Sequence, residues 1–126
     1  MRNLVLLLLG LALGAFATTS VINTLRQRDA YPRGLMQVMQ HHYAALREDV
    51  RHNRCSDSTR AHIGFLRQLA DEMDAAVYPG STPDVPFREY EQRLRDGLNA
   101  ATACVDFPPA FDKISAACDA CHQQYR

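Results

Sequence analysis

Beyond residue 30, apolar residues recur every three or four positions in four successive segments of the chain. The four sets are Met36, Met39, Tyr43, Leu46 and Val50; Ile63, Leu66, Ala70, Met73 and Val77; Phe87, Tyr90, Leu94, Leu98 and Ala101; and Phe107, Phe111, Ile114, Cys118, Cys121 and Tyr125. This spacing places the members of each set on one face of an α-helix. The pattern therefore predicts four amphipathic helices.

Short breaker segments separate the predicted helices. Pro32 suits the first turn of the first helix, and Asp57 or Ser58 can cap the second. The Pro- and Gly-containing run 79–84 separates the second helix from the third, and prolines 108–109 open the fourth. Helices joined by such short connections reverse direction at each one. We therefore expect an all-α fold, an antiparallel up-down-up-down four-helix bundle.

The N-terminal segment has the pattern of an export signal. Arg2 precedes an uncharged, leucine-rich stretch, and residues 15–17 read Ala-Phe-Ala, which suits a signal peptidase. We expect residues 1–17 to be a signal peptide that leaves a domain at 18–126. The alternative is an uncleaved membrane anchor at 4–25, because apolar residues continue that far. Both interpretations place the domain outside the cytoplasm, in the periplasm, either free or anchored to the inner membrane.

Composition narrows the classes of function. The chain has 126 residues, with 14 Lys and Arg against 14 Asp and Glu. This length has room for one domain. Without a basic surplus the chain has no strong attraction for a phosphate backbone, so nucleic acid is not an expected partner. No nucleophile with an adjacent base and no pair of catalytic acids is visible, so we do not expect an enzyme.

Two of the four cysteines stand alone in the sequence. Cys55 follows the first predicted helix, and Cys104 follows the third. In an up-down-up-down arrangement these two helices finish at the same end of the bundle. Export to an oxidising compartment also favours disulfides over free thiols. We therefore expect Cys55 and Cys104 to pair, the alternative being two unpaired thiols.

The other two cysteines belong to a C-x-x-C-H motif at the C-terminal end. Cys118 and Cys121 are three residues apart on a helix, so both thiols leave the same face and can each add across one vinyl group of a haem. His122 then offers an imidazole to the iron. The single motif predicts one covalent haem c. A structural zinc site would need two more nearby ligands, and a thioredoxin-like redox site would need a preceding strand.

Two motifs resemble those of the cytochrome c-prime family. They are the closing C-x-x-C-H-x-x-Y-R at 118–126 and the segment Tyr-Pro-Arg-Gly-Leu-Met-Gln-Val-Met at 31–39. The resemblance covers residues 30–126 and implies that His122 is the proximal ligand, that Arg126 lies on the proximal side and that Met36 faces the open side of the iron. It also suggests a homodimer through the first two helices. The cysteines outside the motif and a shorter stretch between the two motifs depart from the family pattern.

The residue opposite His122 decides between functions. The resemblance implies that methionine there completes a low-spin centre, whereas an apolar residue leaves five-coordinate iron. A His/Met pair suits electron transfer, because a neutral thioether favours ferrous iron. With Met36 as ligand, the sequence predicts an exported monohaem c-type cytochrome that exchanges electrons with redox partner proteins. Arg33 is expected to pair with a haem propionate, although a solvated arginine is an equal alternative.

Other possibilities at this position stay open. Met36 lies on an apolar stripe, so it can instead fill a gap in the core. The protein would then bind nitric oxide or carbon monoxide at five-coordinate iron. Met39 is a second candidate ligand. His41 and His42 lie roughly 8 Å beyond Met36 along the helix axis, too far for a haem held at the end of the bundle. An enzyme of peroxide or nitrogen-oxide chemistry would need a polar distal group, for which His41 is the nearest candidate.

Overall fold

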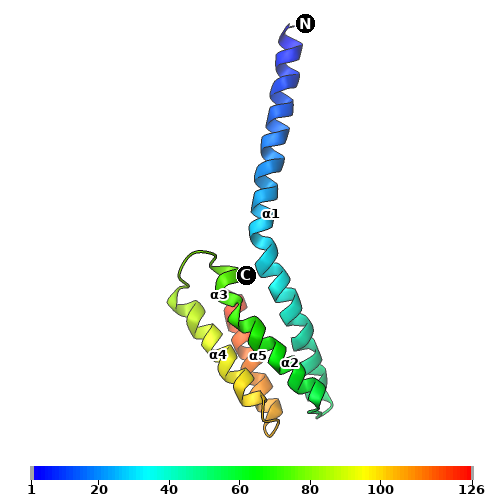
Figure 1. Cartoon of the computed structure of the whole chain (residues 1–126), viewed down its shortest axis with the longest axis vertical. Coiled ribbons are helices and arrows are strands. Elements are labelled where there is room, and N and C mark those ends of the chain that lie inside the picture. Colours follow the sequence, from blue (N-terminus) through cyan, green and yellow to red (C-terminus); the bar gives the residue numbers. More distant parts are fainter. Residues whose placement is uncertain (1, 126) are drawn as a thin grey trace. The chain divides into compact units, whose positions relative to one another are not determined.

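The chain is all-helical over the residues that its structure, a computed structural model, describes. These are residues 2–125, with the side chains of 2–6 and 24–29 excluded. The helices are, in chain order, α1 (Arg2–Arg51), α2 (Asp57–Asp71), α3 (Met73–Val77), α4 (Val85–Ala101) and α5 (Phe107–Gln124), and no strand occurs in this part of the chain (Figure 1). The chain divides into two compact units, at residues 1–33 and 34–126. The predicted all-α class is confirmed.

The first unit consists of the N-terminal part of α1. Its side chains at residues 7–23 are all exposed, and Pro32 near its end is half-buried. Within the stretches that could be searched, no helix combines the length and apolarity of a membrane span. The signal peptide at 1–17 and the anchor at 4–25 both stay predictions.

Two predicted helix boundaries are wrong. α1 does not begin at Pro32 but contains it, because the leucine- and alanine-rich residues before it are themselves good helix formers. Neither Asp57 nor Ser58 caps the second helix. Ser56 does so in a capping box, in which its Oγ accepts from the Thr59 N–H at 3.3 Å and its own N–H donates to Thr59 Oγ1 at 3.0 Å.

The second predicted helix is also divided in two. Its apolar stripe continues into residues 73–77, but α2 ends at Asp71 and the short helix α3 begins at Met73. α4 begins after Asp84, whose carboxylate accepts from the Phe87 N–H at 2.9 Å. α5 has a proline in its first turn, as predicted, where a missing N–H leaves no helical bond unmade.

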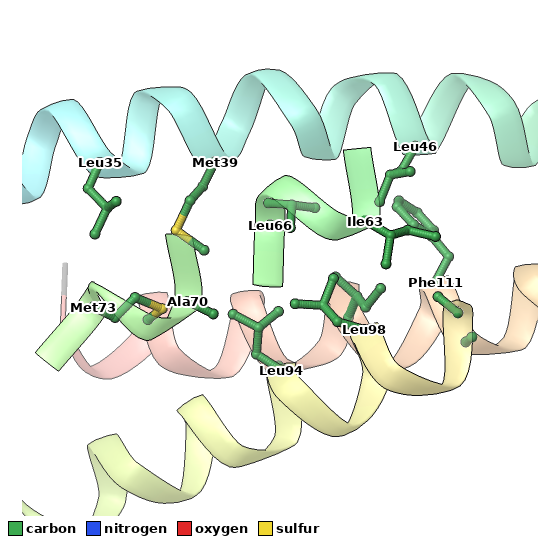
Figure 2. Packing of buried hydrophobic residues seen from close by; sticks show 14 of the residues in the cluster. Leu35, Met39, Leu46, Ile63, Leu66, Ala70, Met73, Leu94, Leu98 and Phe111 are labelled. Atoms are coloured by element: carbon green, nitrogen blue, oxygen red, sulfur yellow. The ribbon is translucent and has the colours of Figure 1, made fainter. Parts of the chain in front are cut away.

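The second unit has one hydrophobic core, to which every helix from α2 to α5 and residues 34–51 of α1 contribute. Figure 2 shows Leu35, Met39 and Leu46 pointing from α1 toward the other helices. The closest backbone packing is between α4 and α5, whereas α1 reaches the core mainly through long side chains. The fully buried large side chains include Phe87, Leu46, Ile63, Leu98 and Ile114.

Contacts near the helix ends show how consecutive helices run relative to one another. Asp49, near the end of α1, accepts from the Thr59 hydroxyl at the start of α2 at 2.7 Å. Tyr125, which ends α5, donates to Asp84 at the start of α4 at 2.5 Å. Each of these helix pairs is therefore antiparallel (Figure 1).

The structure joins Cys55 and Cys104 in a disulfide with Cα atoms 5.9 Å apart. This is the pair that the sequence suggested. The bond ties the α1–α2 connection to the α4–α5 connection, so these two connections share one end of the unit.

Candidate functional site

A cavity of about 140 Å³ lies beside the C-terminal half of α5 and is lined by residues from all five helices, with Leu66 contributed by α2 and Met73 by α3. Cys118, Cys121 and His122 line it from α5. Met36 and Met39 line it from α1. The structure thus brings the C-x-x-C-H motif and the predicted methionine ligand to one cavity, although they belong to opposite ends of the domain sequence.

The two motif cysteines are free thiols in an apolar setting. Cys118 is half-buried and Cys121 is buried. Burial raises the pKa of Cys118 to about 11, with a smaller contribution from the negative charge of Asp119. Burial also raises the pKa of Cys121. Both side chains are therefore neutral thiols at pH 7, inert toward most electrophiles in water but well placed to react with an apolar group held in the cavity.

The α1 side of the cavity is a mixed stripe of residues. Met36, Gln40, Tyr43 and Arg47 follow one another at intervals of four, three and four, and all four line it. The Tyr43 hydroxyl shares a hydrogen bond with Ser115 of α5. The guanidinium carbon of Arg47 lies 5.0 Å from the centroid of the Tyr43 ring. Tyr43 therefore connects α1 to α5 and also positions a cation at the cavity.

Sequence reasoning missed Arg47 and the site role of Tyr43. Tyr43 was assigned only to an apolar helix face. The signal was present in the spacing, because residues 7 and 11 positions after Met36 lie on the same side of a helix. Donation from Arg47 to Tyr43 raises the pKa of Arg47, so the guanidinium remains charged at every physiological pH. Arg47 is thus a cation suited to an anionic ligand group at this cavity.

The C-terminal end of α5 is held in place beside the motif. Tyr125 donates to Asp84, and its ring packs edge-on against Phe87 with centroids 5.5 Å apart. This hydrogen bond lowers the pKa of Asp84, while burial and the same bond raise the pKa of Tyr125. The helix turn that carries His122 is therefore anchored to the start of α4.

The other predicted site residues fall into three groups. Arg33 belongs to the first unit and is not among the described residues lining the cavity, so its pairing with a propionate stays a prediction. Arg126 lies outside the described residues. His41 and His42 are also absent from the lining, and the imidazole of His42 contacts His62 instead.

In the searched part of the chain, no three His, Cys, Asp or Glu side chains are already arranged around a metal position.

The residues that line the cavity have the chemistry that a c-type haem needs, but the cavity is smaller than a typical cofactor site. Two thiols, an imidazole and a thioether face a mostly apolar space, which is the donor set that covalent haem attachment and axial ligation require. The volume is below the ≈ 300–1,000 Å³ typical of small-molecule and cofactor sites. Met36 and Met39 are long, unbranched side chains with several rotamers, so among the lining residues they are the ones best able to adjust to a larger group.

Comparison of the chain with protein-family models, with curated proteins and with solved structures found no match. The inference of function therefore depends on the residues and geometry of this chain.

Proposed function

We propose that this protein is an exported electron-transfer cytochrome that carries one covalent haem c. In this proposal residues 34–126 form an antiparallel up-down-up-down four-helix bundle. Cys118 and Cys121 would hold the haem through thioether bonds, and His122 and Met36 would bind its iron. The observation that carries the proposal is that Met36 of α1 lines the same cavity as the C-x-x-C-H residues of α5.

A bound haem supplies a one-electron couple, which the surrounding protein tunes. The thiols of Cys118 and Cys121 would hold the haem covalently by addition to its two vinyl groups. His122 and Met36 are both neutral donors, and a thioether ligand favours the reduced state. The apolar lining limits access of water, while Arg47 offers a positive charge to an acidic substituent.

Outer-sphere transfer is the expected reaction, because with both axial positions filled no position remains for a substrate. Redox partner proteins are then the expected partners. The resemblance of residues 31–39 and 118–126 to the cytochrome c-prime family supports this class, and the methionine favours its low-spin branch. The same resemblance suggests a homodimer.

A second candidate function is the binding of nitric oxide or carbon monoxide at five-coordinate iron. Met36 is only half-buried and packs against the hydrophobic core, so its thioether has a packing role that does not require a metal. In that case the position opposite His122 is open to a diatomic ligand. The coordination state of the iron separates the two functions.

The test is production of the full chain in a host that exports and matures c-type cytochromes. We expect the mass of the product to exceed that of the polypeptide by one haem, and the colour to stay with the protein after denaturation. Replacement of Cys118 and Cys121 by alanine should abolish this covalent attachment, whereas replacement of Cys55 and Cys104 should not. A colourless product with the mass of the bare chain would refute the proposal.

A further inference from the structure

A group of three imidazoles lies outside the haem cavity, where α1 packs against α2. His41 and His42 belong to α1, and His62 belongs to α2. Nδ1 of His42 lies 2.8 Å from Nδ1 of His62. The ring centroid of His41 lies 5.3 Å from that of His42 and 6.4 Å from that of His62. None of these residues has a role in the proposed electron transfer.

Neighbouring contacts hold the two close imidazoles in place. The ring of Phe65 stacks on His42 with centroids 5.0 Å apart and planes inclined by 17°. The bond between Asp49 and Thr59 fixes α1 against α2 toward their connection. His42 and His62 are each half-buried, so their positions are set by packing but one side of the pair remains open to solvent.

The distance between the two nitrogens fits a pair of adjacent ligands on one metal ion. An imidazole nitrogen binds a first-row metal at about 2.0–2.1 Å. Two such nitrogens at a right angle around the metal are about 2.9 Å apart, whereas two at a tetrahedral angle are about 3.3 Å apart. The 2.8 Å separation is that of a hydrogen bond between the two imidazoles, and it is also close to the spacing of adjacent ligands in the square-planar or tetragonal coordination that Cu²⁺ and Ni²⁺ prefer.

The protonation state of His42 also suits a metal. Burial lowers the pKa of His42, and the positive charges that His62 and His41 would carry lower it further. The neutral imidazole is the form that binds a metal ion, so less proton competition occurs at pH 7.

We propose that His42 and His62 form a binding site for a divalent transition-metal ion that prefers tetragonal coordination, such as Cu²⁺, with water completing its coordination. Cu²⁺ is expected to bind this site most tightly, because it has the highest affinity for nitrogen donors among the divalent first-row metals. His41 lies beside the site and is not required for it. The proposal does not depend on the haem.

The test is titration of the full purified chain with Cu²⁺ at pH 7, followed by electron paramagnetic resonance and by thermal unfolding. Iodoacetamide first blocks any thiol that is free, so that copper cannot bind or oxidise it. We expect one Cu²⁺ with a tetragonal spectrum and splitting from two nitrogens. We also expect a rise in melting temperature on addition of Cu²⁺, since a metal bound only to the folded state stabilises it.

Matched variants assign the binding to the two histidines. His62→Asn and His42→Asn should each weaken Cu²⁺ binding by at least about tenfold and abolish the two-nitrogen splitting. His52→Asn is the control, because His52 pairs with Glu48 on the exposed surface of α1. This variant should bind Cu²⁺ as tightly as the parent does. Circular dichroism without metal verifies that each variant is folded.

Two results would overturn the proposal. One is unchanged copper affinity and spectrum in folded His62→Asn. The other is loss of binding in His41→Asn with binding intact in His62→Asn. Ni²⁺ titration by calorimetry gives an independent readout, in which His62→Asn should again lose affinity while His52→Asn should not.

Discussion

At the scale of single residues, Gly97 determines how closely α4 and α5 approach. A Cβ at this position would lie 2.9 Å from Cγ1 of Ile114 and 3.1 Å from its backbone nitrogen. Both atoms belong to a buried residue of a packed helix, so they cannot move away without shifting α5. The absence of a side chain at Gly97 therefore allows the closest helix contact of the domain.

Gly97→Ala should lower the free energy of unfolding by up to about 2 kcal/mol, because overpacking costs about 1–3 kcal/mol and the gain in helix propensity returns only about 1 kcal/mol. Urea denaturation measures the change. Gly64→Ala is the matched control, since nothing lies within 4 Å of a Cβ there. The free energy of unfolding of Gly64→Ala should exceed that of the parent by up to about 1 kcal/mol. Equal gains in the two variants would mean that the α4–α5 contact is looser than the structure indicates.

Met36 and Met39 offer a matched test of the sixth ligand. Met36→Leu should convert the loaded protein from low-spin to high-spin ferric iron, remove the far-red band typical of His/Met ligation and admit carbon monoxide rapidly, because leucine has no donor atom. Met39→Leu should leave the spectrum unchanged, since Met39 is 7% exposed and belongs to the hydrophobic core. If the Met36→Leu spectrum matches that of the parent, another group binds the iron.

At the scale of the elements, Arg95 joins a buried carboxylate of α4 to an exposed carboxylate at the end of α2. Glu91 is 6% exposed and pairs with Arg95 one helical turn later, and Arg95 also pairs with Asp71 at the end of α2. Burial raises the pKa of Glu91, although the bond from Arg95 opposes this effect. The folded state therefore binds a proton at Glu91 more tightly than the unfolded state does. Stability from this group is present at low pH and decreases as pH rises above the ordinary value of 4.5.

Glu91→Gln should remove this pH dependence, because an amide does not ionise. The stability of the variant relative to the parent should increase as pH rises from 4 to 7, and urea unfolding at several pH values in this range measures it. Glu89→Gln is the control, since Glu89 is exposed and forms only a surface pair with Arg93. A difference between variant and parent that does not change with pH would contradict the raised pKa.

The helices themselves could be predicted from the sequence more reliably than their ends. The apolar spacing located the helical segments, since each stripe depends only on residues within a few turns of one another. The start at Pro32 was wrong, because a proline is tolerated where the preceding residues form helix strongly. The cap at Asp57 or Ser58 was also wrong, because Ser56 caps α2 instead. The break at Glu72 had no comparable signal in the apolar pattern.

At the scale of the whole molecule, the Cys55–Cys104 disulfide closes a loop with a sequence separation of 49 residues. In the chain-entropy account, such a bond stabilises the folded state by about 4 kcal/mol. Replacement of both cysteines by serine should therefore lower the free energy of unfolding by about that amount. Reduction should destabilise the parent similarly and leave the variant unaffected.

Alkylation followed by mass measurement gives the pairing directly. Before reduction, the unloaded and denatured chain should accept two labels, at Cys118 and Cys121, and the haem-loaded chain should accept none. Four labels on the unloaded chain without reductant would show that Cys55 and Cys104 are not bonded.

The sequence by itself determined what local spacing controls. Cys118, Cys121 and His122 are within one helical turn, so their proximity needs no tertiary contact. Only the tertiary structure decided which residues of different helices lie together: Met36 and Arg47 at the cavity of the motif, Ile114 against Gly97, and His62 beside His42. These meetings depend on the rotation and crossing of each helix, which all core side chains set together through close packing.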